Sequence, residues 1–212
     1  MRSPVLTLGC AALLMVGNMS ATLLADNPWT VGRSTIDRVS DLIEALTQRE
    51  RYDEALAVSA ELARGADPNG DASAKAVIRQ SGVLVARQMG QPRFNEEDIL
   101  LVTAPVNQLM SSYPDHPRHW FLKAQLTNAR QKAALHSVLR AAVSPADDST
   151  RDEATRSLLR ATKELEQLSN EVRDARIQLD QQRGERPLAL IGDLARLQQE
   201  LVVDTVSLAL MQ

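Results

Sequence analysis

Apolar residues in the last third of the chain alternate four and three residues apart, the spacing of a helix that packs along a seam. The pattern predicts a long helix from about Thr150 to Arg183, with polar residues at its other positions. The segment Gly184-Glu185-Arg186-Pro187 predicts a turn, and a second leucine-rich helix follows over residues 187–211. The two seams consist of Ala154, Leu158, Ala161, Leu165, Leu168, Val172, Ala175 and Leu179, and of Leu190, Leu194, Leu197, Leu201 and Leu208.

Together the seams predict an antiparallel, coiled-coil-like helical hairpin, because folding the chain between Gly184 and Glu185 sets them against each other in one register. Asp204 is the exception, since this register places it opposite Leu165. We expect helical drift to leave Asp204 at the edge and to turn Thr205 inward; a buried acid with a basic partner is the alternative. The register pairs Leu179 with Leu190, Ala175 with Leu194, Val172 with Leu197, Leu168 with Leu201 and Ala161 with Leu208.

The C-terminal helix is apolar on more than one side. Besides the seam it carries Val202, Val203, Val206, Leu210 and Met211, more apolar surface than a contact between two helices buries. We expect a third helix to cover the remainder, and self-association is the alternative.

Residues 34–117 show the spacing of four amphipathic helices arranged as two hairpins. Capping and stop residues set the expected limits. These limits are a start at Ser34 or Thr35, a break over 50–53, an end at Gly65, a start near Asp71, an end at Gly90, and a last helix from Asn95 to Tyr113 with a kink at Pro105.

The first hairpin contains Arg51-Tyr52-Asp53-Glu54-Ala55-Leu56 and closes with Asp67-Pro68-Asn69, which resembles one tetratricopeptide repeat. The resemblance covers about residues 34–117 and implies an array of helical hairpins. The second unit is looser, with Gly82 in its first helix, Phe94-Asn95-Glu96 at its turn and Tyr113-Pro114-Asp115 at its close. The region as a whole departs from the family pattern at Ile43, at Glu97 and in the longer loop through Gln91-Pro92.

Two such hairpins need a further partner, because about three repeats are usually required for stability. The segment after Pro117 can supply it, since no Gly or Pro occurs between Arg118 and Val143; one long helix and two short ones fit equally. The predicted fold is therefore all-α, with repeat-like hairpins over 34–117 and a long-helix bundle over 118–212 that contains the 150–183/187–211 hairpin.

Composition supports a folded, helical protein, with 44% hydrophobic, 24% charged and 3% aromatic residues. A net charge of -3 and few aromatic side chains argue against nucleic-acid binding, which needs a basic surface or a stacking platform.

The N-terminal segment 1–25 has the layout of a secretory signal: Arg2, an apolar stretch from Val5 to Val16, and small residues before a cut after Ala21 or Ala25. An uncleaved membrane anchor is the alternative, and it would be the only membrane contact. Both predict export to the periplasm or cell envelope. Cys10 is the single cysteine, and Thr7 argues against lipidation there.

Candidate chemistry is sparse. Asp115-His116-Pro117-Arg118-His119 puts two of the three histidines, with His136 elsewhere, next to a carboxylate, but a metal site needs three or four ligands, so we expect an exposed turn between helices. No catalytic, cofactor-binding or metal-ligating residue is nominated. Glu96-Glu97 and Asp147-Asp148 suit helix N-termini. We expect intrahelical ion pairs between the arginines and the acids of the long helix, which are Arg151, Arg156, Arg160, Arg173, Arg176 and Arg183, and Glu164, Glu171 and Asp180.

The predicted function is that of an exported, non-enzymatic adaptor or scaffold that binds other proteins, because helical arrays present grooves and long faces. A holding chaperone of the cell envelope is the alternative. An enzyme whose site is assembled from scattered residues is a third, less favoured hypothesis.

Overall fold

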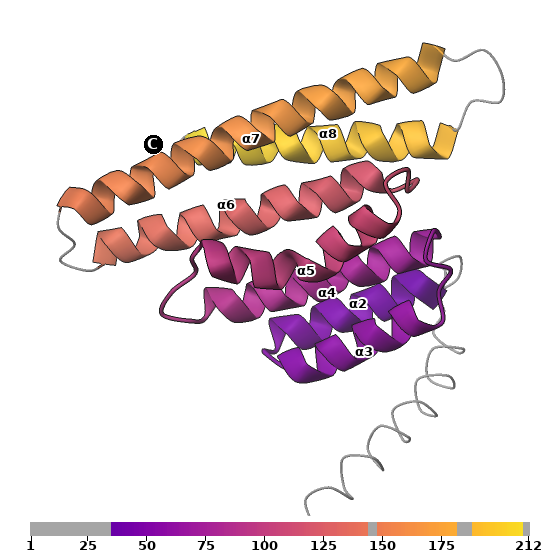
Figure 1. Cartoon of the computed structure of the whole chain (residues 1–212), viewed down its shortest axis with the longest axis horizontal. Coiled ribbons are helices and arrows are strands. Elements are labelled where there is room, and N and C mark those ends of the chain that lie inside the picture. The colour runs from indigo at the N-terminus through magenta and orange to yellow at the C-terminus, as the bar shows by residue number, and fades with distance from the viewer. Residues whose placement is uncertain (1–34, 144–147, 182–187, 210–212) are drawn as a thin grey trace, which may run out of the picture. The chain divides into compact units, whose positions relative to one another are not determined.

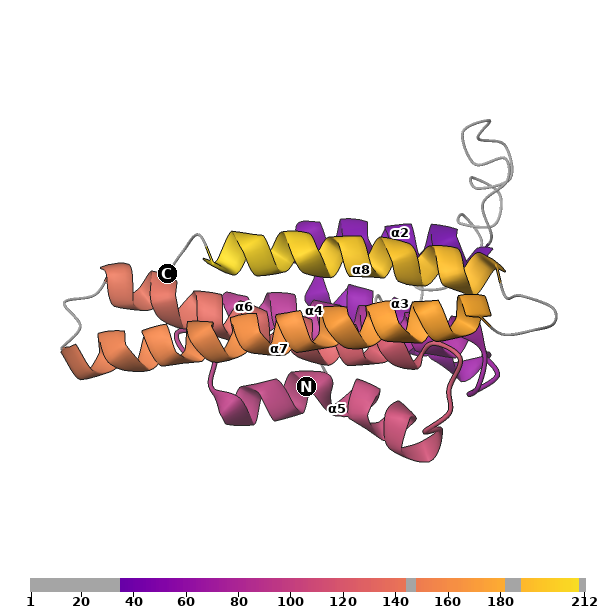
Figure 2. The ribbon, with the colours of Figure 1, turned by 90° about the horizontal axis from the view of Figure 1, so that it is seen from above.

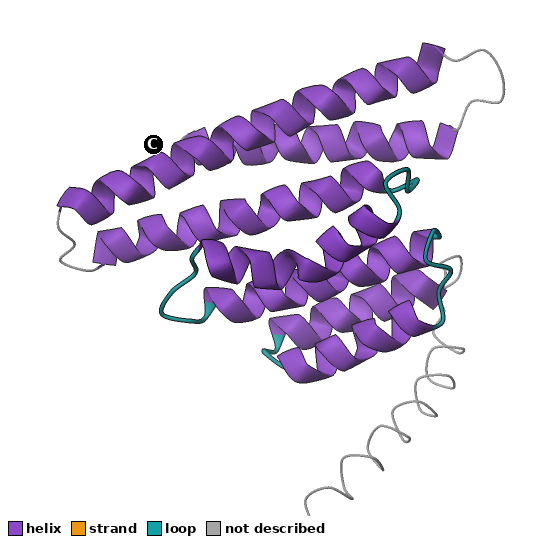
Figure 3. Cartoon of the chain, viewed as in Figure 1, coloured by secondary structure: helices purple, strands orange, loops and turns teal. Residues whose placement is uncertain are grey.

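The computed structural model describes residues 35–143, 148–181 and 188–209. Every regular element in these ranges is a helix, which confirms the all-α prediction (Figure 3). The predictions for segment 1–25, for the cap at Ser34, for Asp147, for Arg183, for the turn at 184–187, and for Leu210 and Met211 lie outside the described residues. The helices are α2 (Thr35–Gln48), α3 (Tyr52–Arg64), α4 (Asp71–Met89), α5 (Glu96–Ser112), α6 (His119–Val143), α7 (Asp148–Gln181) and α8 (Leu188–Ala209).

Residues from Val39 onward form one compact unit; Thr35 to Arg38, the first turn of α2, belong to a separate N-terminal unit. Within the larger unit α7 packs against both α8 and α6, and α6 also contacts α4 and α5 (Figures 1 and 2). Among the described residues, no helix has the length and apolarity needed to cross a membrane.

The helix limits follow the predicted capping residues closely. Gly65 and Gly90 are the C-caps of α3 and α4, and Asn95 is the N-cap of α5. One boundary differs, because α3 begins at Tyr52, inside the predicted break. Glu50 takes up the turn before it, with a φ of 59° in the left-handed region that favours glycine. Pro105 lies inside α5, which changes direction along its length in Figure 2.

The segment after Pro117 forms the single helix α6, which contributes to separate clusters of buried residues on its two sides. Leu122 packs in a cluster with α4 and α5, and Ala129 and Ala133 pack in a second cluster with those helices. Ala134 belongs to the cluster formed by α7 and α8. Small alanine side chains let helices approach closely, so α6 joins the hairpins to the long bundle.

The predicted seams form the core between α7 and α8, and this confirms the heptad interpretation. Most seam residues are buried together, and Leu179 and Leu190 pack at the margin of the cluster. Asp204 and Thr205 are both half-buried, which agrees with the edge placement, and the Thr205 hydroxyl donates to the Leu201 carbonyl at 2.8 Å. The individual residue pairs of the register stay a prediction.

The prediction that a third helix covers the C-terminal apolar residues is wrong for three valines. Val202, Val203 and Val206 are 47%, 58% and 53% exposed. Helix α6 adds Trp120, Phe121 and other side chains to this core, but it packs mainly against α7 and does not cover the three valines.

The expectation of intrahelical ion pairs along α7 is also wrong for several residues. Arg160 pairs with Glu96 of α5 at 3.5 Å. Glu164 accepts from Arg130 of α6 at 3.2 Å, and Glu171 accepts from Lys123 of the same helix. The charges that flank the seam therefore bind neighbouring helices, while Arg173 and Asp174 pair within α7 at 3.1 Å.

Candidate protein-interaction groove

A groove of about 1200 Å³ opens where the α4–α5 loop, the start of α5, the second half of α6 and the start of α7 meet. Its apolar lining consists of buried side chains from each of these segments, namely Phe94, Ile99, Ala133 and Ala154. We call this feature the α5–α7 groove.

Contacts with α4 and α6 fix the loop that forms one wall of the groove. The Nε2–H of His136 on α6 donates to the Gln91 carbonyl at 3.0 Å, which sets the tautomer of this buried imidazole. The Phe94 ring meets His136 edge-on, with ring centroids 6.3 Å apart. The Gln88 amide donates to the Arg93 carbonyl at 3.0 Å. The loop therefore lies against α6 in a defined conformation.

A capping box positions the first turn of α5 at the groove. The Asn95 side chain accepts from the Asp98 backbone N–H at 3.0 Å, and the Asp98 carboxylate accepts from the Asn95 N–H at 2.9 Å. This confirms that Glu96 and Glu97 are helix N-terminal charges, as predicted, and it also places both on the groove lining.

Charged side chains surround the apolar lining of the groove. The Glu96–Arg160 pair links α5 to α7, but both side chains are largely exposed, so the pair adds little stability. Apart from it the lining has three arginines and two glutamates, a local excess of positive charge in a chain whose net charge is -3. These residues are Arg93, Arg140 and Arg156, and Glu97 and Glu153.

The dimensions and lining of the groove suit a polypeptide better than a small molecule. Small-molecule sites are mostly enclosed and apolar, at roughly 300–1000 Å³. Here the volume is about 1200 Å³, and guanidinium and carboxylate groups line much of the surface. Guanidinium groups bind carboxylates in a planar, two-bond geometry, so the arginines can select acidic side chains on a partner.

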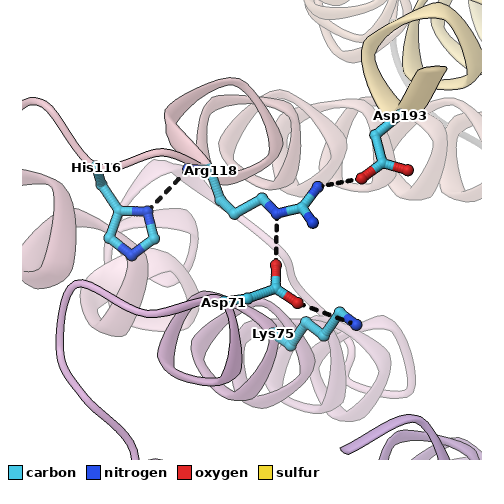
Figure 4. A network of polar contacts seen from close by, with 5 residues as sticks. All are labelled: Asp71, Lys75, His116, Arg118 and Asp193. Carbon is cyan, nitrogen blue, oxygen red and sulfur yellow. Dashed lines mark hydrogen bonds and ion pairs between the residues drawn. The ribbon is translucent and has the colours of Figure 1, made fainter. Parts of the chain in front are cut away.

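A separate polar network fastens α8 to the hairpins (Figure 4). Arg118, just before α6, donates through Nε to Asp71 at the start of α4 and through Nη1 to Asp193 of α8, the latter at 2.5 Å. Lys75 also pairs with Asp71, at 3.2 Å. Burial lowers the pKa of the Arg118 guanidinium, but the hydrogen bond to Asp193 and the charge of Asp71 outweigh it, so the pKa lies above its usual range.

The same segment contains the histidines singled out in the sequence. The expected exposed turn is wrong for His116, which is only 3% exposed, although Asp115 and Pro117 beside it are exposed. The Arg118 backbone N–H donates to His116 Nδ1 at 2.9 Å. His116 therefore stabilises the turn that positions the Arg118 side chain. Within the described residues no group of three or more His, Cys, Asp or Glu is placed to hold a metal ion.

A second inter-helix contact joins α6 to α7 near this network. Lys123 pairs with Glu171 and lies over the Trp120 ring, 5.6 Å from its centroid. The hydrogen bond from Lys123 holds the pKa of the Glu171 carboxyl below its ordinary value against the opposing effect of burial, and a 2.9 Å bond from Gln167 adds to it.

Comparison with protein-family models, with curated proteins and with solved structures finds no match for this chain. The resemblance to tetratricopeptide repeats therefore stays a prediction. The structure shows helical hairpins over the matching region without testing the family assignment.

No local signal in the sequence marks the groove or the Arg118 network. Arg118 lies 47 and 75 residues from its two acidic partners, so no local spacing signals the contact. Arg93 and Arg140 lie in a loop and at a helix end, and nothing in the sequence places them beside the start of α7.

We predict that Arg118→Met lowers the free energy of unfolding by about 1–3 kcal/mol, because two part-buried carboxylates lose a charged donor. Arg118→Lys keeps the positive charge, but an ammonium group cannot bond both carboxylates in the planar geometry of a guanidinium. The free energy of unfolding of this variant should therefore lie between those of Arg118→Met and wild type. Urea denaturation followed by circular dichroism measures the effect. An unchanged midpoint for Arg118→Met would contradict the role of the network, and Arg173→Met on exposed α7 surface is the matched control.

A pH dependence follows from the lowered pKa of Glu171. Because the folded-state pKa lies below the unfolded value, the Lys123–Glu171 contact is fully stabilising above about pH 5 and is lost as the pH falls through the folded-state pKa. Glu171→Gln should therefore cost about 0.5–1 kcal/mol at pH 7, with the difference from wild type shrinking towards pH 3. Denaturation at both pH values checks this, and a difference that grows on acidification would refute it.

Proposed function

We propose that this chain is an exported, non-enzymatic adaptor or scaffold that holds a polypeptide segment in the α5–α7 groove. The observation that carries the proposal is the groove itself, whose apolar lining and arginine-rich rim come from residues 92–99, from the second half of α6 and from the start of α7. The N-terminal signal layout supports export to the periplasm or cell envelope. The groove chemistry favours a partner segment with acidic side chains beside apolar ones.

A holding chaperone is a second candidate, favoured by exposed leucines on α5. Leu100 and Leu101 are largely exposed and follow Glu96 and Glu97 by about one helical turn, so apolar surface continues beyond the groove. A chaperone would suppress aggregation of many unfolded clients, whereas an adaptor binds one partner at fixed stoichiometry.

The test is affinity capture of the tagged chain from an envelope extract, followed by binding of each purified candidate in a titration calorimeter. We predict that Arg140→Glu together with Arg156→Glu abolishes binding of the specific partner, because the charge of two groove arginines is reversed. Arg173→Glu changes an exposed residue of α7 that lies away from the groove, and it should leave binding unchanged. A partner that binds all three proteins equally would contradict the groove assignment.

A further inference from the structure

Helix α8 has a second apolar face that no described helix covers. This face, which we call the α8 strip, is distinct from the buried seam and repeats with heptad spacing through Leu188, Ala195, Val202 and Ala209. A Cβ added at Gly192 would meet no atom within 4 Å, so the strip faces open space there, and its other members are exposed except Ile191, Ala195 and Gln198, which are half-buried. The strip consists of Leu188, Ile191, Gly192, Ala195, Gln198, Gln199, Val202, Val203, Val206 and Ala209.

The absence of charge on the α8 strip sets it apart from the exposed side of α7. All ten strip residues are uncharged, whereas the exposed side of α7 carries Arg156, Lys163, Glu166 and Arg173. An amphipathic helix normally presents charged residues to water, so a long uncharged exposed face indicates a surface that another helix covers.

The order of residues along the strip allows it to pair with a second copy of itself. In an antiparallel pair centred between Gln198 and Gln199, Ala195 faces Val202, Ile191 faces Val206 and Leu188 faces Ala209, so apolar residues meet along the contact. Two identical helices related by a two-fold axis must meet in this manner, because residue i contacts j while j contacts i.

The charges beside the strip favour the same antiparallel pairing. Arg196 and Glu200 are exposed and lie at one edge of the strip, one on each side of the proposed axis. In an antiparallel pair centred at residues 198 and 199, Arg196 of one copy faces Glu200 of the other, and the reverse contact forms at the other end. Opposite charges therefore meet at both ends of the central turn.

We infer that the α8 strip binds the α8 strip of a second copy of this chain, forming an antiparallel, two-fold symmetric dimer. Gly192 and Ala195 allow close approach of the two helices, and the exposed valines supply the apolar contact. The α5–α7 groove lies on other helices, so the inference does not depend on the proposed function.

Sedimentation equilibrium of the full chain with Cys10→Ser tests the assembly. We expect a dimer, and we expect the double variant Val202→Lys and Val206→Lys to be monomeric with unchanged helical content. The matched control, Leu159→Lys with Ile177→Lys, alters two exposed apolar residues of α7 and should remain dimeric. A monomeric parent chain, or equal dimerisation of both double variants, would overturn the inference.

Single cysteines in the same background test the geometry and keep the inference falsifiable if the lysine variants fold poorly. Gln199→Cys should crosslink to its own copy with a short thiol reagent, because it lies beside the axis. Ala195→Cys should not crosslink to itself, since its mate lies about 10 Å further along the helix, but it should crosslink to Val202→Cys when the two proteins are mixed. Self-crosslinking of Ala195→Cys as efficient as that of Gln199→Cys would exclude the proposed register.

Discussion

The structure depends on the burial of α6 between two sets of helices. One set of its side chains, including Leu122 and Ala129, completes clusters with α4 and α5, and another, including Ala134 and Trp120, completes the core of α7 and α8. Two helical hairpins bury too little apolar surface to be stable by themselves. A long two-helix hairpin buries only one face of each helix and leaves the other faces exposed to water. Helix α6 provides the missing partner for both, and it also carries one wall of the α5–α7 groove.

Local and periodic features of the fold could be predicted from the sequence. The helix limits follow from capping residues such as Asn95 and Gly90, whose effects act within one turn. The α7–α8 core follows from the heptad seam, because a strict four-three alternation fixes which face is buried. The family resemblance is less informative: Gly82 takes the place of a small residue, yet a Cβ there would meet no atom within 4 Å, so close helix contact does not require it.

The contacts that build the candidate site could not be predicted, because they join residues far apart in the chain. Arg118 bridges Asp71 and Asp193, and Arg160 pairs with Glu96, and in both cases the backbone has to fold before the charges become neighbours. The burial of His116 has the same origin, since the fold covers its side chain while its neighbours Asp115 and Pro117 stay exposed. The exposed valines of α8 were visible as excess apolar residues, but only the structure shows that α6 packs mainly against α7 and leaves them uncovered.

Hydrogen exchange of backbone amides, measured across a series of urea concentrations, tests most directly whether α6 joins the two parts. If it does, the most protected amides of α4, α6, α7 and α8 should share one free energy of opening and lose protection together as urea rises. Leu122→Ala, which creates a cavity on the hairpin side of α6, should then reduce protection in α7 and α8 as well. Full protection of α7 and α8 in that variant, while α4 and α5 exchange freely, would show two independent units and contradict the account.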